Sequence, residues 1–328
     1  MKKINLAIVG ATGMVGRTFL KVLEERNLPI DNFYIFASKK SAGKKIKFMK
    51  KEYVVEELTE EIFNRGIDIA LFSAGGEVSR KYAPIAAACG CIVIDNSSAF
   101  RMEAGVPLVV PEVNAKDIKW HNGIISNPNC STIQAVAALK PLHDKYTIKR
   151  VVYSTYQAVS GAGALAVEDL LEGTNKVFLH QITKNCIPQI DVFEENGYTK
   201  EENKMINETR KILNLPDLKV TATTVRIPVV TSHSESINVE FEKSFELLEL
   251  VEILKNSQGI IVEDDVQKNI YPMPINAEGK DEVFIGRIRR DFSLESGLNM
   301  WVVSDNLRKG AATNAVQIAE EIIREGLV

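Results

Sequence analysis

The chain has 328 residues, more than a single hydrophobic core usually serves, so two domains are expected. Its composition, 45% hydrophobic and 25% charged, is that of a globular protein, and its net charge of −3 gives no reason to expect nucleic acid or a membrane surface as a partner. No apolar run reaches membrane-spanning length. The N-terminal apolar stretch is too short for a signal peptide and runs directly into a glycine turn, so we expect a cytoplasmic protein.

The first part of the sequence alternates strand-like and helical patterns. An apolar strand at residues 4–9 is followed by glycines in a Gly-x-x-Gly-x-x-Gly pattern and then by apolar residues at helical spacing. A second helical pattern covers residues 78–88. Further strands are predicted at residues 33–37, 67–73, 91–95 and 123–126. Alternating strands and helices predict an α/β fold with a parallel, doubly wound Rossmann-type sheet.

The glycine turn is the first candidate binding site. Glycine lets the backbone approach a pyrophosphate closely, and the N-terminus of the next helix supplies N–H donors and a partial positive charge. A tight turn without a ligand is the alternative interpretation. The residues predicted to bind a dinucleotide here are Gly10, Thr12, Gly13, Met14 and Val15, together with Ser73 at the end of the strand 67–73.

The segment after the second strand favours NADP over NAD. NAD-binding folds often end this strand with an acid for the ribose hydroxyls, but here the strand is followed by "SKKSAGKKIKFMKK". Ser38 and Ser41 can donate hydrogen bonds to a phosphate, and Lys40 can neutralise one. We interpret the remaining lysines, at positions 44–51, as a solvated loop.

The second part of the sequence has longer strands. They are predicted at residues 149–160, 220–230, 234–242, 282–291 and 298–306, with helices at 164–172, 201–213 and 245–255. This pattern predicts an antiparallel-rich α+β domain at 128–307. The last helix, 308–328, could return to the first domain, 1–127. Residues 195–204 form the most polar stretch and are expected to be exposed.

Four cysteines and four histidines were considered as reactive or metal-binding groups. Cys89 and Cys91 are too close in sequence for an ordinary disulfide or a metal clip, so we interpret both as reduced, buried thiols. The histidines have no ligand spacing, and no metal site is predicted. Cys130 differs, because the stretch "SNPNCST" places it at the entrance of a predicted helix. A helix N-terminus stabilises a thiolate.

A nucleophilic thiol also needs a base, which must come from elsewhere in the chain. The best candidate is His233, in a turn between two predicted strands, although a turn histidine beside serines is more often solvent-facing. Periodicity alone does not choose it over His121, His143 and His180. Taken alone, Cys130 is also more often inert than reactive.

Several motifs occur in order along the chain: "GATGMVG", "DNSSAFRM", "SNPNCST", "YQAVSGAG" and "VRIPVVTSHSE". Together they resemble the aspartate-β-semialdehyde dehydrogenase family, and the resemblance extends to "SDNLRKGAATNAVQIA" near the C-terminus. It implies NADP-dependent interconversion of aspartyl phosphate and aspartate semialdehyde, early in the route to lysine, threonine and methionine. It further implies a homodimer formed by the catalytic domain.

The resemblance also implies a role for individual residues. Cys130 would be the nucleophile and His233 the acid/base. Gln157, Arg226 and Glu201 would bind the substrate, and Arg101 and Lys204 would bind phosphate. Ser160, Gly161 and Asn314 would lie near the cofactor. Lys40 departs from the family, because many members have arginine there.

These roles are chemically coherent. A thiolate can add to the aldehyde, a hydride can leave, and phosphate can capture the resulting thioester. Backbone N–H groups at the helix start near Cys130 are candidate donors to the oxyanion. Taken singly, Arg226 could instead be a structural ion-pair partner, and Glu201 and Lys204, three residues apart on a helix, could form a plain surface salt bridge. Two alternative functions stay open: another acyl-phosphate or acyl-thioester reductase on this scaffold, and a redox sensor that binds NADP without turnover.

Overall fold

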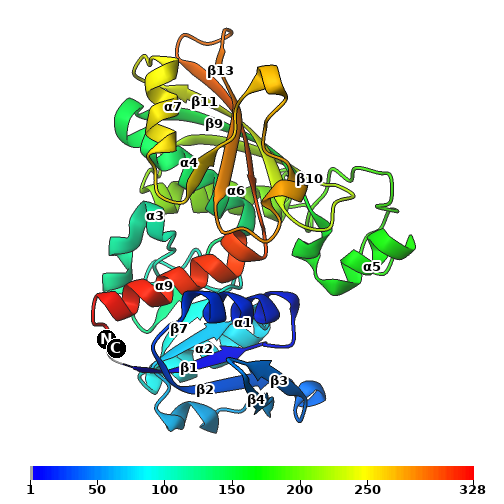
Figure 1. Cartoon of the computed structure of the whole chain (residues 1–328), viewed down its shortest axis with the longest axis vertical. Helices are drawn as coiled ribbons and strands as arrows, with labels where there is room; N and C mark the ends of the chain where they lie inside the picture. Colours follow the sequence, from blue (N-terminus) through cyan, green and yellow to red (C-terminus); the bar gives the residue numbers. More distant parts are fainter. Residues whose placement is uncertain (1–2) are drawn as a thin grey trace. The chain divides into compact units, whose positions relative to one another are not determined.

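The computed structural model describes residues 3–328 and divides into two compact units (Figure 1). The first consists of the chain up to Pro128 together with Ala311–Val328, and the second of Asn129–Gly310. The boundaries expected from sequence, 127/128 and 307/308, lie within a few residues of these. The predicted fold class, a parallel α/β sheet with a second α+β unit, is confirmed.

The first unit is built on a six-stranded sheet in the order β5-β2-β1-β6-β7-β8, parallel throughout. Parallel strands are covered on both faces, which explains their nearly continuous apolar sequences. The strands are β1 (Ile4–Val9), β2 (Ile30–Ala37), β5 (Glu56–Glu57), β6 (Ile69–Phe72), β7 (Ile92–Asp95) and β8 (Ile124–Ser126).

Helices cover the two faces of this sheet. Leu6 and Ile8 of β1 pack in one core with helices α1 and α9, whereas Ala7 and Val9 point to the opposite core with α2. The C-terminal helix therefore belongs to the first unit. The helical segments are α1 (Met14–Arg26), η1 (Lys39–Ser41), η2 (Glu61–Arg65), α2 (Gly76–Ala88), α3 (Pro111–Asn114), η3 (Ala115–Trp120) and α9 (Thr313–Arg324). The segment η6 (Arg308–Ala312) includes residues of both units.

The lysine-rich segment at 44–51 is not the solvated loop that we expected. It forms most of a β-hairpin of β3 (Lys45–Phe48) and β4 (Lys51–Val54). The hairpin packs on the core through Phe48, which is buried and whose ring centroid lies 4.2 Å from that of Phe33. The surrounding lysines gave no sign of this contact in the sequence. The lysines themselves remain largely exposed.

The second unit is built on a mixed six-stranded sheet in the order β10-β9-β11-β14-β13-β12. The pairs β10–β9 and β13–β12 are parallel and the others antiparallel, so the expected antiparallel character holds for the centre of the sheet. The strands are β9 (Ile148–Gln157), β10 (Lys219–Arg226), β11 (His233–Phe241), β12 (Ile260–Val262), β13 (Val283–Asp291) and β14 (Gly297–Ser304).

Helix α4 packs across the core face of this sheet, against β9, β11, β13 and β14. Along β11 the alternate residues Glu235, Ile237 and Val239 are fully buried beneath it, while Ser236 and Asn238 on the other face are half-buried. The helical segments are α4 (Cys130–Tyr146), η4 (Val159–Ala162), α5 (Ala164–Glu172), α6 (Lys200–Leu213), α7 (Leu247–Lys255), η5 (Val266–Lys268) and α8 (Pro274–Ala277).

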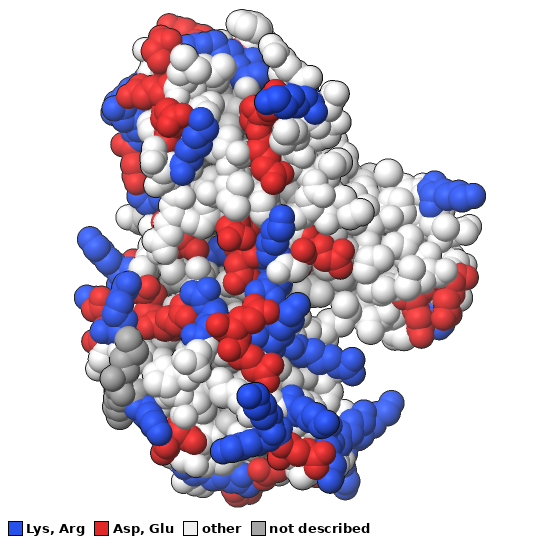
Figure 2. Space-filling model, in the orientation of Figure 1, with Lys and Arg blue, Asp and Glu red and all other residues white. Residues whose placement is uncertain are grey.

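The described surface carries both signs of charge, interspersed on the face that Figure 2 draws. Within residues 3–328, no helix is long and apolar enough to cross a membrane. The same residues contain no group of three or more His, Cys, Asp or Glu arranged to hold a metal ion. Cys91 is buried as expected, but Cys89 is exposed, so the prediction for that pair is wrong in one half.

Candidate active site

The start of α4 is fixed by its N-cap residue, Asn129. Its side-chain oxygen accepts hydrogen bonds from the backbone N–H groups of Ser131 and Thr132 (3.0 and 3.3 Å). Its amide nitrogen donates to Glu201 Oε1 (2.8 Å), and its backbone N–H donates to Glu208 Oε2 (2.7 Å). The N–H groups of residues 131 and 132 are therefore already used, which removes them from the oxyanion donors that we expected at the helix start.

Cys130 and His233 are in direct contact. Cys130 opens α4, His233 opens β11, and His233 Nε2 lies 3.2 Å from the Cys130 sulfur. The other ring nitrogen, Nδ1, accepts a hydrogen bond from the backbone N–H of Ala158 (3.0 Å). A neutral imidazole whose Nδ1 is an acceptor carries its proton on Nε2. Nε2–H is then placed to donate to the sulfur.

His233 is fully buried, contrary to the solvent-facing turn that its sequence setting suggested. Burial, and secondarily the nearby charge of Arg226, lower the pKa of His233 to about 3. The ring is therefore neutral at physiological pH. A neutral ring agrees with the acceptor role of Nδ1.

Glu201 is a buried carboxylate in the first turn of α6. It lies at the end of the polar stretch that we expected to be exposed, yet it is only 5% exposed. Burial alone would raise the pKa of Glu201, but the charge of Lys204 and hydrogen bonds from Asn129 and Gln157 lower it to about 2. The carboxylate is thus ionised, and a capping box of Thr199 and Glu202 fixes the helix that carries it.

Lys204 bridges two carboxylates. Its Nζ lies 3.1 Å from Glu201 Oε2 and 2.9 Å from Asp191 Oδ2. Burial alone would lower the pKa of Lys204, but the two carboxylates raise it above its usual value. The pair Glu201–Lys204 is therefore an ion pair, but a largely buried one rather than the surface pair of the plain helical interpretation.

Arg226 and Gln157 end two adjacent strands. They are register partners in the parallel pair β10–β9, so both side chains emerge at the same edge of the sheet. Gln157 Nε2 donates to Glu201 Oε1 (3.1 Å). Arg226 Nη1 donates to the carbonyl of Ala158 (2.6 Å), while its buried Nε has no hydrogen-bond partner among residues 3–328.

A cavity of about 310 Å³ opens beside Arg226. Phe178, whose ring centroid is 6.0 Å from the guanidinium carbon, and Asp191 contribute to its wall. Gly161 lies beside both Arg226 and His233. A methyl group at this position would be 3.4 Å from the Arg226 guanidinium and from the His233 ring. An anionic group entering the cavity would meet a buried guanidinium with a donor to spare.

In the first unit, the glycine turn has the geometry of a phosphate cradle. Gly10 has a φ of +91°, and a Cβ there would lie 2.4 Å from the carbonyl oxygen of Ser73. A Cβ on Gly16 would lie 2.3 Å from the Gly10 carbonyl oxygen, so helix α1 can begin close to the turn only without a side chain there. Gly13 is the N-cap of α1.

A cavity of about 510 Å³ lies against this turn. Five of the predicted cofactor residues line it: Gly10, Thr12, Gly13, Ser38 and Ser73. Met14, Val15, Lys40 and Ser41 are not among its lining residues. Lys39 lines it, and so does Glu57, an acid that pairs with Ala37 from the neighbouring strand β5. Sequence reasoning missed Glu57 because it inspected only the segment that follows β2.

The remaining predicted residues have well-defined surroundings. In the first unit, Arg101 is buried and donates to the carbonyls of Asn127 (2.9 Å) and Asn96 (3.0 Å). Asn314 is fully buried and donates to the Val109 carbonyl and to Asn127 Oδ1. In the second unit, the Ser160 hydroxyl bonds to the Asn306 side chain. Their roles toward phosphate and cofactor stay predictions.

Two residues of the site were missed. Glu208 anchors the backbone of Asn129, and helical spacing alone gave no sign of that. A Cβ on Gly310 would lie 2.9 Å from the Cys130 Cβ, so glycine at this position leaves room for the Cys130 side chain. The glycine of "RKGAATNA" was a weak signal, since glycine inside a helical segment such as η6 is unfavourable unless close packing requires it.

Comparison with known proteins agrees with this geometry. Residues 5–121 match the family model "Semialdehyde dehydrogenase, NAD binding domain", and residues 139–309 match "Semialdehyde dehydrogenase, dimerisation domain". Aspartate-semialdehyde dehydrogenase of Aquifex aeolicus is 61% identical over 337 aligned positions that cover 99% of both chains. The chain belongs to the aspartate-semialdehyde dehydrogenase family.

Solved structures of the family are closely similar. The crystal structure of aspartate semialdehyde dehydrogenase II from Vibrio cholerae complexed with ASA has 47% identity and a TM-score of 0.95, covering 99% of both chains. The aspartate semialdehyde dehydrogenase with NADP from Candida albicans has 26% identity and a TM-score of 0.80, covering 100% of both. The predicted family and enzyme activity are therefore confirmed, as is an NAD(P)-binding domain.

The lowered pKa of His233 predicts acid sensitivity of the second unit. Between the ordinary histidine pKa and about 3, the unfolded chain binds a proton that the folded chain does not, so stability falls as pH decreases below 6.5. From pH 6.5 to 5.0 the wild type should lose about 2 kcal/mol more unfolding free energy than His233→Asn. Trp301 fluorescence during urea unfolding, with Trp120→Phe in both proteins, reports this unit. Equal losses in the two proteins would contradict the prediction.

Proposed function

We propose that this protein catalyses the reversible, NADP-dependent conversion of L-aspartyl 4-phosphate to L-aspartate 4-semialdehyde through a thioester on Cys130. The observation that carries the proposal is the 3.2 Å contact between the Cys130 sulfur at a helix N-terminus and the Nε2 of a buried, neutral His233. The same chemistry serves the route to lysine, threonine and methionine. The cytoplasm is the expected compartment, because the nucleophile has to stay reduced.

The charged groups around the Cys130 thiol suit a substrate that carries an α-carboxylate and an ammonium group in addition to its acyl group. Arg226, with an unused buried Nε, can take the substrate α-carboxylate. Glu201 can pair with the substrate ammonium, and Gln157, already bonded to Glu201, can orient the same substrate. An N-acetylated substrate has no ammonium for this carboxylate, so Glu201 favours a free amino acid over an acetylated one.

Phosphate binding is assigned to Lys204 and Arg101. Lys204 is held by two carboxylates, so a phosphate must compete with Glu201 and Asp191 for its ammonium group. When the ammonium of Lys204 turns to phosphate, Glu201 loses one cation and can accept the substrate ammonium in its place. Binding of phosphate and of the amino acid would then support each other.

The covalent steps use the chain's own groups in a defined order. In the oxidative direction the Cys130 thiolate forms a bond to the aldehyde carbon and gives the anion of a hemithioacetal, with the negative charge on the former aldehyde oxygen. The nicotinamide supplies or accepts the hydride when it is bound. Loss of hydride from the hemithioacetal carbon leaves a thioester, and phosphate oxygen then attacks the acyl carbon, so the carbon–sulfur bond breaks and the thiolate returns. The reductive direction reverses each step.

His233 acts first as a hydrogen-bond donor in this scheme. Its Nε2–H can stabilise the thiolate before attack and the oxygen of the tetrahedral adduct afterwards. That role replaces the backbone donors of residues 131 and 132, which Asn129 occupies. Transfer of a proton to or from the adduct oxygen requires the Nδ1 bond from Ala158 to change, which would make the proton-transfer role a dynamic one.

Replacing the nucleophile should abolish turnover. Cys130→Ala removes the atom that forms the thioester, so NADPH formation from aspartate semialdehyde and phosphate should fall by at least 10³-fold. Absorbance of NADPH measures it. Cys186→Ala is the matched control, because that cysteine is exposed, and it should keep the wild-type rate.

Omission of phosphate provides the second arm of the same assay. The wild type should then form no more than about one NADPH per active site before stopping, because the thioester is not captured. Sustained turnover by Cys130→Ala, or sustained turnover without phosphate, would refute the thioester route. A redox sensor without catalysis would show no turnover in either protein, and its Cys130 thiol would be oxidised in the wild type.

The cofactor site fits a dinucleotide phosphate group, and NADP is the proposed form. The close-packed turn at Gly10, followed by the N-cap Gly13, would accept a pyrophosphate at the start of α1. Ser38 and Lys39 line the cavity that would take a 2′-phosphate, and Lys40 follows them directly in the chain, whereas Glu57 would bind ribose hydroxyls and repel a phosphate. Preference for NADP is thus the result of opposing charges rather than of lysines alone.

Lys40→Ala should weaken NADP binding about tenfold, because one charge-assisted contact is lost. NAD binding should stay within about twofold, since NAD has no 2′-phosphate. Lys44→Ala, an exposed lysine nearby, is the matched control and should change neither affinity. Calorimetric titration of each variant with both cofactors measures this, and tighter binding of NAD than of NADP by the wild type would overturn the cofactor assignment.

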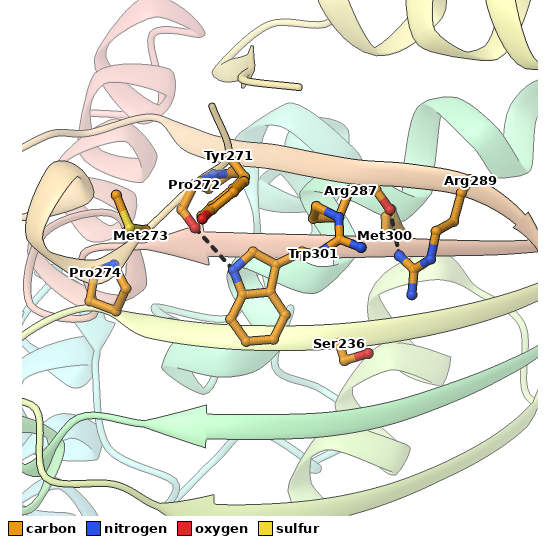
Figure 3. A pocket seen from close by; sticks show the side chains of 9 residues that line it. All are labelled: Ser236, Tyr271, Pro272, Met273, Pro274, Arg287, Arg289, Met300 and Trp301. Atoms are coloured by element: carbon orange, nitrogen blue, oxygen red, sulfur yellow. Dashed lines mark hydrogen bonds between the residues drawn. The ribbon is translucent and has the colours of Figure 1, made fainter. Parts of the chain in front are cut away.

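A homodimer is proposed through the sheet face that α4 leaves open. Tyr156 and Trp301 lie there with ring centroids 5.3 Å apart. Figure 3 shows the Trp301 indole lying along the sheet, with its Nε1–H donating to the Pro272 carbonyl (3.1 Å), and a cavity of about 320 Å³ beside it. Aromatic side chains on a half-exposed face are typical of protein interfaces.

Trp301→Glu should weaken the dimer at least tenfold, because the apolar area of the indole is lost and a carboxylate has to be desolvated in its place. Light scattering during gel filtration across a concentration series measures the mass. Trp120→Glu in the first unit, where the indole is 45% exposed, is the control and should remain a dimer. A dimer of unchanged stability in Trp301→Glu would place the interface elsewhere.

A further inference from the structure

Glu235 is a buried carboxyl group that the reaction does not use. It lies on β11, two residues after His233 and on the same face of the strand, and it is fully buried. Neither of its oxygens has a hydrogen bond of full geometry to any residue within 3–328. A buried acid without a paired cation is costly, so it is expected to have a specific reason to be there.

Its neighbour is Gln134 on α4. Gln134 Nε2 lies 3.4 Å from the carbonyl oxygen of His233, which is two residues before Glu235 on the same strand. The amide oxygen Oε1 is buried and has no partner among the described residues. Burial raises the pKa of Glu235 well above its usual value, so this carboxyl group keeps its proton at neutral pH and can donate it to an amide oxygen.

The spacing of these residues repeats that of Cys130 and His233. Gln134 follows Cys130 by four residues on one helix, a rise of about 6 Å. Glu235 follows His233 by two residues on one strand, a rise of about 6.7 Å. Helix and strand pack against each other, and this spacing would place two successive rungs between them: sulfur with imidazole, then amide with carboxyl.

We propose that Glu235 is a positioning residue that, hydrogen-bonded to Gln134, sets the register of α4 against β11 and so holds the Cys130 sulfur at His233. The proposal rests on the roles proposed above for those two residues. Glu235 itself touches neither substrate nor cofactor. The other titratable groups near this rung are Tyr153 on β9, whose pKa is raised by burial and slightly by Glu235, and His233 on its own strand.

The rung can be removed without leaving a buried charge. Glu235→Leu keeps the bulk and removes both oxygens, so kcat should fall at least tenfold while KM stays within twofold, because substrate contacts are elsewhere. The rate at which iodoacetamide alkylates Cys130 should fall at least fivefold, since the thiol loses its donor. Alkylation is measured with Cys89→Ser and Cys186→Ser in every protein, because both of those thiols are exposed.

Glu235→Gln is the conservative control. An amide is neutral, has nearly the same shape and can still donate to Gln134, so both rates should stay within threefold of wild type. Gln134→Leu breaks the rung from the other side and should reproduce the loss. The double variant Glu235→Leu/Gln134→Leu should be no worse than the poorer single variant, because both remove one interaction.

The outcomes separate this proposal from the proposed function. A wild-type alkylation rate in Glu235→Leu overturns the positioning role, and so does a loss in Glu235→Gln equal to that in Glu235→Leu. If Glu235→Leu does not fold, a wild-type alkylation rate in Gln134→Leu overturns it equally. If Cys130→Ala keeps turnover, the proposed function fails, whereas the alkylation rates still report the register.

Discussion

A single contact between the first residue of a helix and the first residue of a strand organises the second unit. The Cys130 sulfur and His233 Nε2 are 103 positions apart in sequence and 3.2 Å apart in space. Such a contact needs α4 and β11 to be fixed in both position and register. The cap at Asn129 fixes where the helix begins, and the fully buried side chains along β11 fix which face of the strand meets it.

Buried charge is the second constraint. Glu201, Lys204 and Arg226 are all largely buried, yet each keeps its charge. An oppositely charged group or a hydrogen-bond partner lies close to each of them and stabilises the charged form. A charged amino-acid substrate can enter such a site by exchanging partners rather than by bringing new charge into an apolar space. The same low-dielectric surroundings keep His233 neutral, which suits a donor of hydrogen bonds better than a cation would.

Periodicity and motifs predicted most strands and helices, because a buried parallel strand and an amphipathic helix each leave a regular apolar pattern. The hairpin containing Phe48 was missed because one buried aromatic residue among lysines does not make a pattern. The burial of His233 was missed for a related reason. This residue starts strand β11, and the residues in contact with its ring, Ala158 and Cys130, are distant in sequence.

The chemistry of the site was readable only through the combination of motifs. No local signal shows that Asn129 reaches both Glu201 and Glu208, or that Glu57 comes beside Ala37 from another strand, since these contacts depend on tertiary packing. Similarity supplied the roles, and geometry supplies their physical reasons.

The most direct test of the account is to trap its covalent intermediate. The wild type would be mixed with L-aspartyl 4-phosphate in the absence of NADPH, quenched in acid, digested and examined by peptide mass spectrometry. We predict one aspartyl group per chain on the peptide that contains Cys130, removable by hydroxylamine as a thioester is. An acyl group on another residue, or no acyl group on an enzyme that turns over when NADPH is added, would contradict it.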